Sequence, residues 1–283
     1  MSKLQRTYRI EIDIEGQDTI VIVPPLTINF TVTRRYQSSL NTMQLDIRNI
    51  SKKYRDLIFQ DFFDDRTRKT IRLFAGYDDL SLLFEGSLVE AYSSRDGTNI
   101  ITHITGKDGS WDTQNTYTYQ TINKGQTVGD ILDFLAGQFE FLKKGAIGDY
   151  SDVLQRPVVL NGQTYELLKQ YSDGDVMIDN GRIYVMKENE VVEGVVPLIN
   201  NKSGIISTPR RTEGIVQVQT LLETQLTIGE KARFESSIEP VYNGEYKVLG
   251  LVHQGTISGA VSGTCITTID FQVEGEIFKT VAS

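Results

Sequence analysis

Apolar and polar residues alternate over most of the first hundred positions, which is the pattern of half-buried β-strands. The clearest case is TYRIEIDIEG, where Tyr8, Ile10, Ile12 and Ile14 share one face. The same period recurs in LTINFTVTRR, MQLDIRNI, KTIRLFAGY, LLFEGSLVEAYSS and TNIITHITGKD. One short amphipathic helix interrupts the strands, and Ser51 is its candidate N-cap. Residues 1–111 are therefore predicted to form a mainly β segment.

Helical spacing replaces this alternation after Trp111. Thr127 and Asp130 form a capping-box-like start, and apolar residues then recur at helical intervals until Gly145. These residues are Val128, Ile131, Leu132, Leu135, Phe139 and Leu142. A second short helix is predicted over TYELLKQY, after a turn at Asn161-Gly162.

The strongest hairpin pattern of the chain lies in the same region. The strands DVMID and RIYVM flank Asn180-Gly181, a pair that accepts positive φ in a two-residue turn. Together with the two helices, this hairpin predicts that residues 112–203 form a compact α+β insert.

Strand patterns return from Gly204 onward, in GIVQVQTLL, LTIGEKARFESS, GEYKVLGLVHQG and GTCITTIDFQVEG. Asn243-Gly244 is predicted to be another tight turn, with Gly244, like Gly181, at positive φ. The predicted fold class is mainly β with a small α+β insert. Two β-barrel-like domains, residues 1–111 and 204–283, flank the insert of residues 112–203.

Composition and charge argue against several classes of function. The 283 residues carry a formal net charge of −8, which argues against high-affinity nucleic-acid binding, because such binding needs a basic stripe to neutralise phosphates. The short basic clusters at Arg34-Arg35, Lys52-Lys53 and Arg210-Arg211 are predicted to be solvated or protein-facing surface. No apolar run approaches the roughly 18 residues of a membrane span, and no secretory signal is visible. The single cysteine, Cys265, excludes an internal disulfide and favours a reducing compartment.

No motif in the sequence carries a reaction, so no catalytic, cofactor-binding or metal-binding residue is predicted. The stretch HQGTISG, residues 253–259, offers a histidine and a serine, but a glycine turn between them would hold a nucleophile loosely. His103 and His253 are the only histidines, and both are predicted to be strand residues rather than metal ligands.

Acidic clusters leave a hydrolase as an alternative, since paired carboxylates can cleave glycosides. Such clusters occur at Asp61, Asp64 and Asp65, and at Asp173 and Asp175. The second cluster, SDGD, lacks the spacing and the later glutamate of a calcium loop. Both clusters are predicted to lie in turns, where aspartate bonds to nearby backbone.

Several long phrases resemble phage baseplate hub proteins. In the first segment these are LTINFTVTRRYQSSLNTMQLDIRNISKKYRDLI and IRLFAGYDDLSLLFEGSLVEAYSSRDGTNIITHITGKDG. In the last segment they are GIISTPRRTEGIVQVQTLLETQLTIGEKARFESS and NGEYKVLGLVHQGTISG. The resemblance spans nearly the whole chain in the same order. It implies that HQGTISG ends a strand and turns, with Gly255 and Gly259 supplying backbone freedom.

The resemblance also implies a structural role in the virion tail baseplate. A hub of this family is expected to be a homotrimer whose subunits each contribute two similar tube domains, so that the ring has pseudo-sixfold symmetry. It would join the sixfold tail tube to the threefold central spike, let DNA pass, and contact other baseplate proteins and the tape measure protein. Assembly in the host cytoplasm is implied, without cofactors, sequence-specific nucleic-acid binding or membrane insertion.

Two other function classes stay open at this point. One is a cell-wall-degrading enzyme that uses acidic residues, and the other is a carbohydrate-binding tail module. The binding module would favour exposed aromatic side chains, but Trp111 is the only tryptophan. Because no lysozyme-like or peptidase-like segment is visible, the chain is expected not to be an enzyme.

Overall fold

The computed structural model describes residues 6–36, 40–61, 67–259, 263–272 and 278–282. The described part of the N-terminal segment holds seven strands and one helix. They are β1 (Thr7–Ile14), β2 (Ile20–Ile22), β3 (Ile28–Arg35), β4 (Thr42–Arg48), α1 (Lys52–Ile58), β5 (Lys69–Gly76), β6 (Leu80–Asp96) and β7 (Asn99–Lys107). As the alternation predicts, Tyr8, Ile10, Ile12 and Ile14 are all buried. The Ser51 hydroxyl accepts a hydrogen bond from the Tyr54 amide and caps α1.

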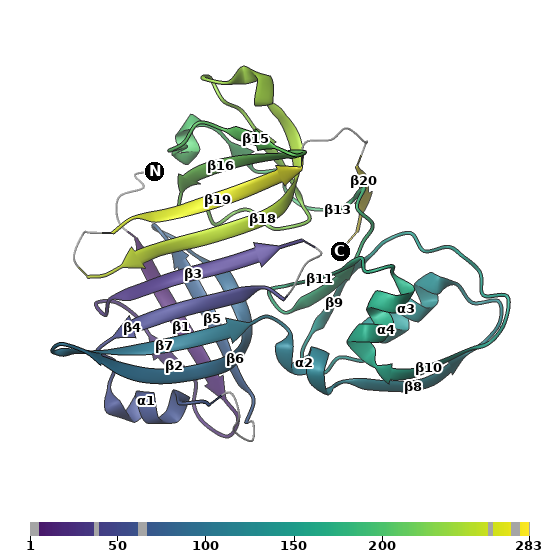
Figure 1. The fold of residues 1–283 in the computed structure, drawn as a ribbon, viewed down its shortest axis with the longest axis horizontal. Helices are drawn as coiled ribbons and strands as arrows, with labels where there is room; N and C mark the ends of the chain where they lie inside the picture. Colours follow the sequence, from purple (N-terminus) through teal and green to yellow (C-terminus); the bar gives the residue numbers. More distant parts are fainter. Residues whose placement is uncertain (1–5, 37–39, 62–66, 260–262, 273–277, 283) are drawn as a thin grey trace.

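The insert begins after β7 and mixes short helices and strands (Figure 1). Its elements are α2 (Ser110–Asn115), β8 (Tyr117–Ile122), α3 (Val128–Ala136), β9 (Lys143–Ile147), β10 (Val158–Gln163), α4 (Thr164–Tyr171), β11 (Val176–Asp179), β12 (Arg182–Val185), β13 (Glu190–Val192), β14 (Leu198–Ile199) and the 3-10 turn η1 (Asn201–Ser203).

The last segment returns to strands. It comprises β15 (Arg210–Thr212), β16 (Ile215–Leu221), β17 (Lys231–Phe234), the 3-10 turn η2 (Pro240–Tyr242), β18 (Gly244–Ile257), β19 (Cys265–Gln272) and β20 (Lys279–Val281). The predicted class, mainly β with helices concentrated between two β segments, is confirmed.

A single 13-stranded sheet joins the first and last segments (Figure 1). Its main path is β15-β16-β19-β18-β3-β4-β7-β6-β5-β1-β2, with β17 on β18 and β14 on β17. The two segments meet where β18 pairs antiparallel with β3 from Gly250↔Arg35 to Ile257↔Ile28. The two β segments are therefore continuous through main-chain hydrogen bonds.

Five consecutive strands are repeated within this sheet. The order β3-β4-β7-β6 in the first segment matches β15-β16-β19-β18 in the last, and β5 and β17 extend each set beside β6 and β18. Each set contains the same two hairpins, because β3·β4 corresponds to β15·β16 and β6·β7 corresponds to β18·β19. We call these sets repeat 1 (β3–β7) and repeat 2 (β15–β19).

The registers of the two repeats also agree. In repeat 1 the pairing of β6 with β7 shifts by one residue between Leu88 and Glu90, as a β-bulge produces. In repeat 2 the pairing of β18 with β19 shifts between Val248 and Gly250. Position 88 thus corresponds to position 248, and the two hairpins are bent at the same place.

Among the residues that the structure describes, three hydrophobic cores support these parts. One lies within the N-terminal strands, one beneath repeat 2, and one around α3 and α4 in the insert. The β11–β12 hairpin belongs to two of them: Ile178 and Ile183 pack in the insert core, whereas Met177 and Tyr184 pack beneath repeat 2. Both faces of this hairpin are buried, so it fixes the insert against the sheet.

The longer helix predicted in the insert is shorter than expected. The Thr127–Asp130 capping box forms as predicted, but α3 ends at Ala136 rather than near Gly145. Phe139 and Leu142 stay buried outside the helix, because the chain turns at Gly137 and continues as β9, which pairs with β12. The predicted turn at Asn161-Gly162 is wrong, since both residues pair with β8 inside β10.

Candidate functional site: the polar sheet face and the buried junction behind it

One face of the sheet is polar across both repeats. Side chains on β3, β4, β6 and β7 alternate, so that one set faces the core and the other faces away. Cross-strand register places the outward residues side by side, as in Asn29↔Asp46, Gln44↔Thr105 and Thr105↔Glu90. The outward set continues through β18, β19 and β16 with Gln254, Thr256, Thr268, Asp270, Gln217 and Gln219.

Hydrogen bonds between neighbouring strands order this polar face. His103 bonds to Asp46 through Nδ1 at 2.7 Å and to the Ser94 hydroxyl through Nε2 at 2.8 Å. In repeat 2, the side-chain amide of Gln217 donates to the Asp270 carboxylate at 2.8 Å. His103 is thus a strand residue of an exposed face, held by its neighbours across the sheet.

The charges on the polar face have both signs. Its cations include Arg35, Arg48 and Lys107, and its acids include Asp46, Glu90 and Asp270. Arg35 lies 3.5 Å from Asp270, an ion pair that crosses the boundary between the repeats. Such a surface offers no continuous basic stripe for phosphate groups.

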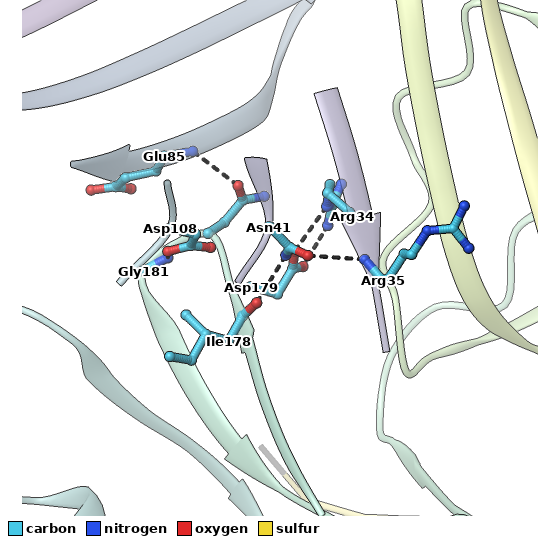
Figure 2. Close-up of polar contacts among 9 residues, drawn as sticks. Arg34, Arg35, Asn41, Glu85, Asp108, Ile178, Asp179 and Gly181 are labelled. Atoms are coloured by element: carbon cyan, nitrogen blue, oxygen red, sulfur yellow. Dashed lines mark hydrogen bonds and ion pairs between the residues drawn. The ribbon is translucent and has the colours of Figure 1, made fainter. Parts of the chain in front are cut away.

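Behind this face, the tip of the β11–β12 hairpin is anchored by an ion pair (Figure 2). Arg34 of β3 donates from Nε and Nη2 to the two carboxylate oxygens of Asp179, the first at 2.8 Å. Both residues are only 3% exposed. Burial opposes the charge of Arg34, but Asp179 outweighs it and raises the pKa of the guanidinium. The prediction that Arg34 is surface is therefore wrong.

Asn41 completes the contact between the sheet and the hairpin (Figure 2). Its side-chain nitrogen donates to the Ile178 carbonyl at 2.8 Å and to Asp179 at 2.9 Å. Its side-chain oxygen accepts from the Arg35 amide at 2.9 Å. One buried amide thus fixes the hairpin and the end of β3 together.

Asp108 holds the turn of the hairpin from the other side. Its Oδ1 accepts from the Gly181 amide at 3.1 Å, while the Asn180 side-chain oxygen accepts from the Glu85 amide at 3.1 Å (Figure 2). Burial, with a further contribution from Asp179, raises the pKa of the Asp108 carboxyl well above its ordinary value. Burial and the negative neighbour thus disfavour the charged carboxylate, whereas the backbone amides of Gly181 and Asn180 favour it.

A second anchor joins the insert to β18. Lys247 is fully buried, donates from Nζ to the Glu188 carbonyl at 3.0 Å, and lies 3.7 Å from the centre of the Tyr36 ring. The Tyr36 hydroxyl donates to the Met186 carbonyl at 2.9 Å. Burial lowers the pKa of Lys247 to about 8, although Glu188 and other nearby acids oppose the shift.

His253 is a core residue at the boundary between the repeats. It is 0% exposed, pairs with Val32 across the β18·β3 ladder, and bonds through Nδ1 to the Thr267 hydroxyl at 2.9 Å. Burial, together with the charge of Arg34, lowers its pKa to about 3. A neutral, enclosed imidazole that bonds to a threonine fills space between strands.

The predicted turns differ in their geometry. Asn180 and Gly181 have φ of 48° and 72°, the positive values expected for a two-residue hairpin turn. The prediction for Gly244 is wrong: Gly244 begins β18 and is absent from the positive-φ glycines, because η2 reverses the chain before it.

The two glycines of HQGTISG also differ from expectation. Gly255 does not lie in a turn but inside β18, opposite Cys265 and Phe30. A β-carbon there would lie 2.6 Å from the Thr264 carbonyl oxygen, so close backbone approach demands glycine. Gly259 follows the end of β18, where a β-carbon would lie 2.8 Å from the Pro25 side chain. At both positions the requirement is space rather than positive φ.

The acidic clusters do not assemble in the described part of the chain. Asp173 lies in a turn with φ of 55°, and the Tyr150 hydroxyl donates to Asp175 at 3.2 Å. Asp61 is exposed, whereas Asp64 and Asp65 lie outside the described residues. Within those ranges, no three His, Cys, Asp or Glu side chains are grouped to hold a metal ion. No helix there has the length and apolar character to cross a membrane.

Sequence reasoning missed the buried polar junction, although one signal was present. In LTINFTVTRR, Arg34 occupies the same parity as Ile28, Phe30 and Val32, which marks it as core-facing. Its partner Asp179 lies 145 positions further along the chain, so no local sequence pattern predicts this contact.

Comparisons with known proteins agree with this architecture. The family model described as "Baseplate hub gp41" matches residues 8–256. The 43 kDa tail protein of prophage MuSo2 from Shewanella oneidensis is similar in structure, with a TM-score of 0.60 at 12% identity over 93% of this chain and 96% of that one. A tail protein from Neisseria meningitidis MC58 gives 0.60 at 8% identity, over 95% and 97%.

A third similar structure comes from a bacterial secretion apparatus. The E. coli c3393 protein, described as a type VI secretion component with similarity to the T4 tail proteins gp27 and gp5, gives a TM-score of 0.57 at 10% identity, over 96% of this chain and 79% of that one. At such identities these likenesses show the fold. No curated protein matches. Because the family model covers most of its length, the chain belongs to the baseplate hub gp41 family, the structural hub proteins of phage tails.

Proposed function

We propose that three copies of this hub form a ring of pseudo-sixfold symmetry that joins the sixfold tail tube to the threefold central spike. The repeat carries the proposal: each chain holds two five-strand units with the same order, register and bulge. Three chains therefore present six equivalent units, which matches a sixfold partner on one side while the ring itself stays threefold.

We further propose that the polar face of the sheet lines the central passage for DNA. Its uncharged polar side chains and mixed charges suit a wall along which a polyanion slides without being held. The net charge of −8 per chain supports the same property.

The proposed domain division keeps residues 1–111 and 204–283 as the two tube domains and residues 112–203 as the insert. The insert extends sideways from the sheet in Figure 1, which supports a place outside the ring. Its β8–β10 face exposes Tyr117, Tyr119 and Val159, and these apolar side chains are the candidate contact with other baseplate proteins.

The spike and tube partners and assembly in the host cytoplasm belong to the same proposal. One similar structure is described as a complex of Francisella PdpA and VgrG. The proposed role requires no enzyme activity, because the junctions found here position strands rather than a substrate.

Counting the subunits tests the ring. Native mass spectrometry or reconstruction of isolated tails is expected to find three copies of the chain at the tip of the tube. Six copies, or a single copy, would contradict the proposal. Zymography on peptidoglycan tests the absence of lytic activity, and a cleared band from the purified chain would restore the hydrolase alternative.

A further inference from the structure

Corresponding edges of the two repeats have different neighbours. In repeat 2, β18 pairs with β19 on one side and with β3 on the other, from Gly250 to Ile257. In repeat 1, β6 pairs with β7 from Ser87 to Asp96. On the opposite side, Ser87 pairs with Thr70 of β5, and beyond Ser87 the described residues supply only the isolated bridge between Ala91 and Gln60.

The same contrast holds for the first strand of each repeat. β3 lies between β4 and β18, whereas β15 pairs with β16 alone and ends the described sheet. All three residues of β15, Arg210–Thr212, are exposed. Each chain thus contains one complete junction of this kind, between β18 and β3. The corresponding strands of the other repeat ends, β6 and β15, lie apart in the chain and do not pair with each other.

We propose that β15 of one subunit pairs antiparallel with β6 of the next, so that each subunit boundary repeats the internal β18·β3 junction. This inference rests on the proposed ring and names the contact that closes it. The register follows from the repeat, because Val252↔Thr33, His253↔Val32 and Gln254↔Thr31 inside the chain have known counterparts. The counterparts are Tyr92 opposite Thr212, Ser93 opposite Arg211, and Ser94 opposite Arg210.

Burial at corresponding positions supports this assignment. His253 and Val32 are both 0% exposed, and they lie side by side across the β18·β3 ladder. Their counterparts Ser93 and Arg211 are both exposed, and Tyr92 is 46% exposed. The exposed pair occupies the positions that a neighbouring strand covers in the internal junction.

Local geometry also fits an incoming strand of three residues. The Tyr36 amide donates to the Leu249 carbonyl. Leu249 and every second residue after it on β18 therefore direct their backbone N–H and C=O groups toward β3. Their counterparts on β6 include Ala91, which exchanges both hydrogen bonds with Gln60, and then Ser93. An incoming β15 would end at Thr212, just before Gln60, because Glu213 and Gly214 turn the chain with φ of 47° and 83°.

A groove lies beside this edge on its core side. It has a volume of about 420 Å³ and is lined by Ala91, Tyr92 and Ser93 from β6 and by Asp56 and Phe59 from α1 and its end. Arg211 of an incoming strand would point to this side, since it is the counterpart of core-facing Val32. The groove gives its long side chain space, and its lining carries both a carboxylate, Asp56, and a guanidinium, Arg55.

A second copy of the chain is the occupant that fits. Within one subunit, β16, β19, β18, β3, β4 and β7 separate β15 from β6, and Figure 1 shows the two at opposite sides of the sheet. The contact uses two different edges of each subunit and is therefore heterologous, the type that closes rings when the rotation permits.

Disulfide trapping tests this contact in assembled tails. Tyr92→Cys and Thr212→Cys are combined in each subunit, because a pair that exchanges no backbone hydrogen bonds places its Cα atoms about 4.5 Å apart, within disulfide range. Mild oxidation and a non-reducing gel are expected to show a covalent trimer as the main product. The second pair, Ser94→Cys with Arg210→Cys, is expected to give the same band and replaces the first if that variant does not assemble.

The matched control combines Ser93→Cys with Thr212→Cys, which places the two thiols on opposite faces of the sheet and is expected to leave monomers. Native Cys265 is buried and common to all variants. Tails that contain three copies but give no covalent trimer with either pair would overturn the strand pairing and leave the ring intact. Equal trapping of the control would overturn the register, whereas a copy number other than three would refute the proposed function itself.

Discussion

Repeat 1 and repeat 2 share a strand plan, yet equivalent positions have different environments. Ser93 on β6 is exposed, and its counterpart His253 on β18 is completely buried. The strands themselves do not cause this difference, because both pair with the following hairpin strand in the same register. The cause is β3, which lies beside β18 and has no counterpart beside β6 within the described chain.

A second contrast concerns the insert. Arg34, at the end of β3, is buried against Asp179 of the hairpin, whereas its counterpart Glu213 lies in the exposed β15–β16 turn. The insert contacts one end of repeat 1 and, through Lys247, one end of repeat 2. Arg34 and Lys247 are thus buried because the insert packs beside them, whereas Glu213 has no such neighbour in the described chain.

The largest expected effect comes from a substitution that tests the contrast between buried Arg34 and exposed Glu213. Asp179→Ala leaves the Arg34 guanidinium buried without its partner, and removing one member of a buried pair costs about 3–5 kcal/mol of unfolding free energy. Urea denaturation measures the loss. The matched change Glu213→Ala is expected to stay within about 0.5 kcal/mol, as for other exposed residues. Similar losses in the two variants would show that the junction does not stabilise the fold.

The next effect compares the paired and unpaired edges directly. His253→Ala removes a fully buried ring and its bond to Thr267, and such a truncation is expected to cost about 2–4 kcal/mol in the isolated chain. Ser93→Ala at the equivalent position is expected to change little. Thermal melts of both variants provide the measurement, and a large loss from Ser93→Ala would mean that β6 is already covered in the monomer.

The buried imidazole also gives the chain a specific pH dependence. The pKa of His253 is about 3 when folded, below the ordinary value of 6.5, so the unfolded chain binds a proton first as the pH falls. Its contribution to stability is therefore complete above pH 6.5 and is lost toward pH 3, at up to about 1.4 kcal/mol per pH unit.

Comparison with His253→Gln isolates this contribution, because other acids titrate alike in both proteins. From pH 7 to pH 5, the wild type is expected to lose about 2 kcal/mol more than the variant in urea titrations. Parallel pH profiles would show that the ring is hydrated or charged when folded.

The smallest effect separates the two predicted glycine turns. Gly181→Val forces a β-branched residue into φ of 72° and is expected to cost about 1–2 kcal/mol. Gly244→Val begins a strand without positive φ, where the added β-carbon meets the Tyr246 ring at 3.3 Å, and it is expected to cost less. The difference between their melting temperatures is the measurement; the reverse order would contradict the turn geometry.

Local features of the fold were predictable because they depend on neighbouring residues. The alternation of Ile10 and Ile12, the Ser51 cap, the Thr127–Asp130 capping box and the Asn180-Gly181 turn all form as their sequences indicate. Each depends on residues within a few positions of one another, where periodicity and capping chemistry operate.

The features that position the site depend on contacts across the whole chain. Asn41 and Ile178, or Thr33 and Val252, meet only after the sheet has formed. Gly255 shows the same limit, since its lack of a side chain is explained by Thr264 on the adjacent strand rather than by a turn. Pairing of this kind determines which strand edge is covered, and no local pattern contains that information.

The matching register shifts at Leu88/Glu90 and Val248/Gly250 have a mechanical consequence. An extra residue on one strand bends and twists a sheet locally. Because the bends occur at corresponding positions, repeat 1 and repeat 2 bend at the same place, and in the proposed ring both halves of each subunit would contribute a similar bend to the wall. In that ring, force transmitted along the tail would be shared between the two halves of each subunit.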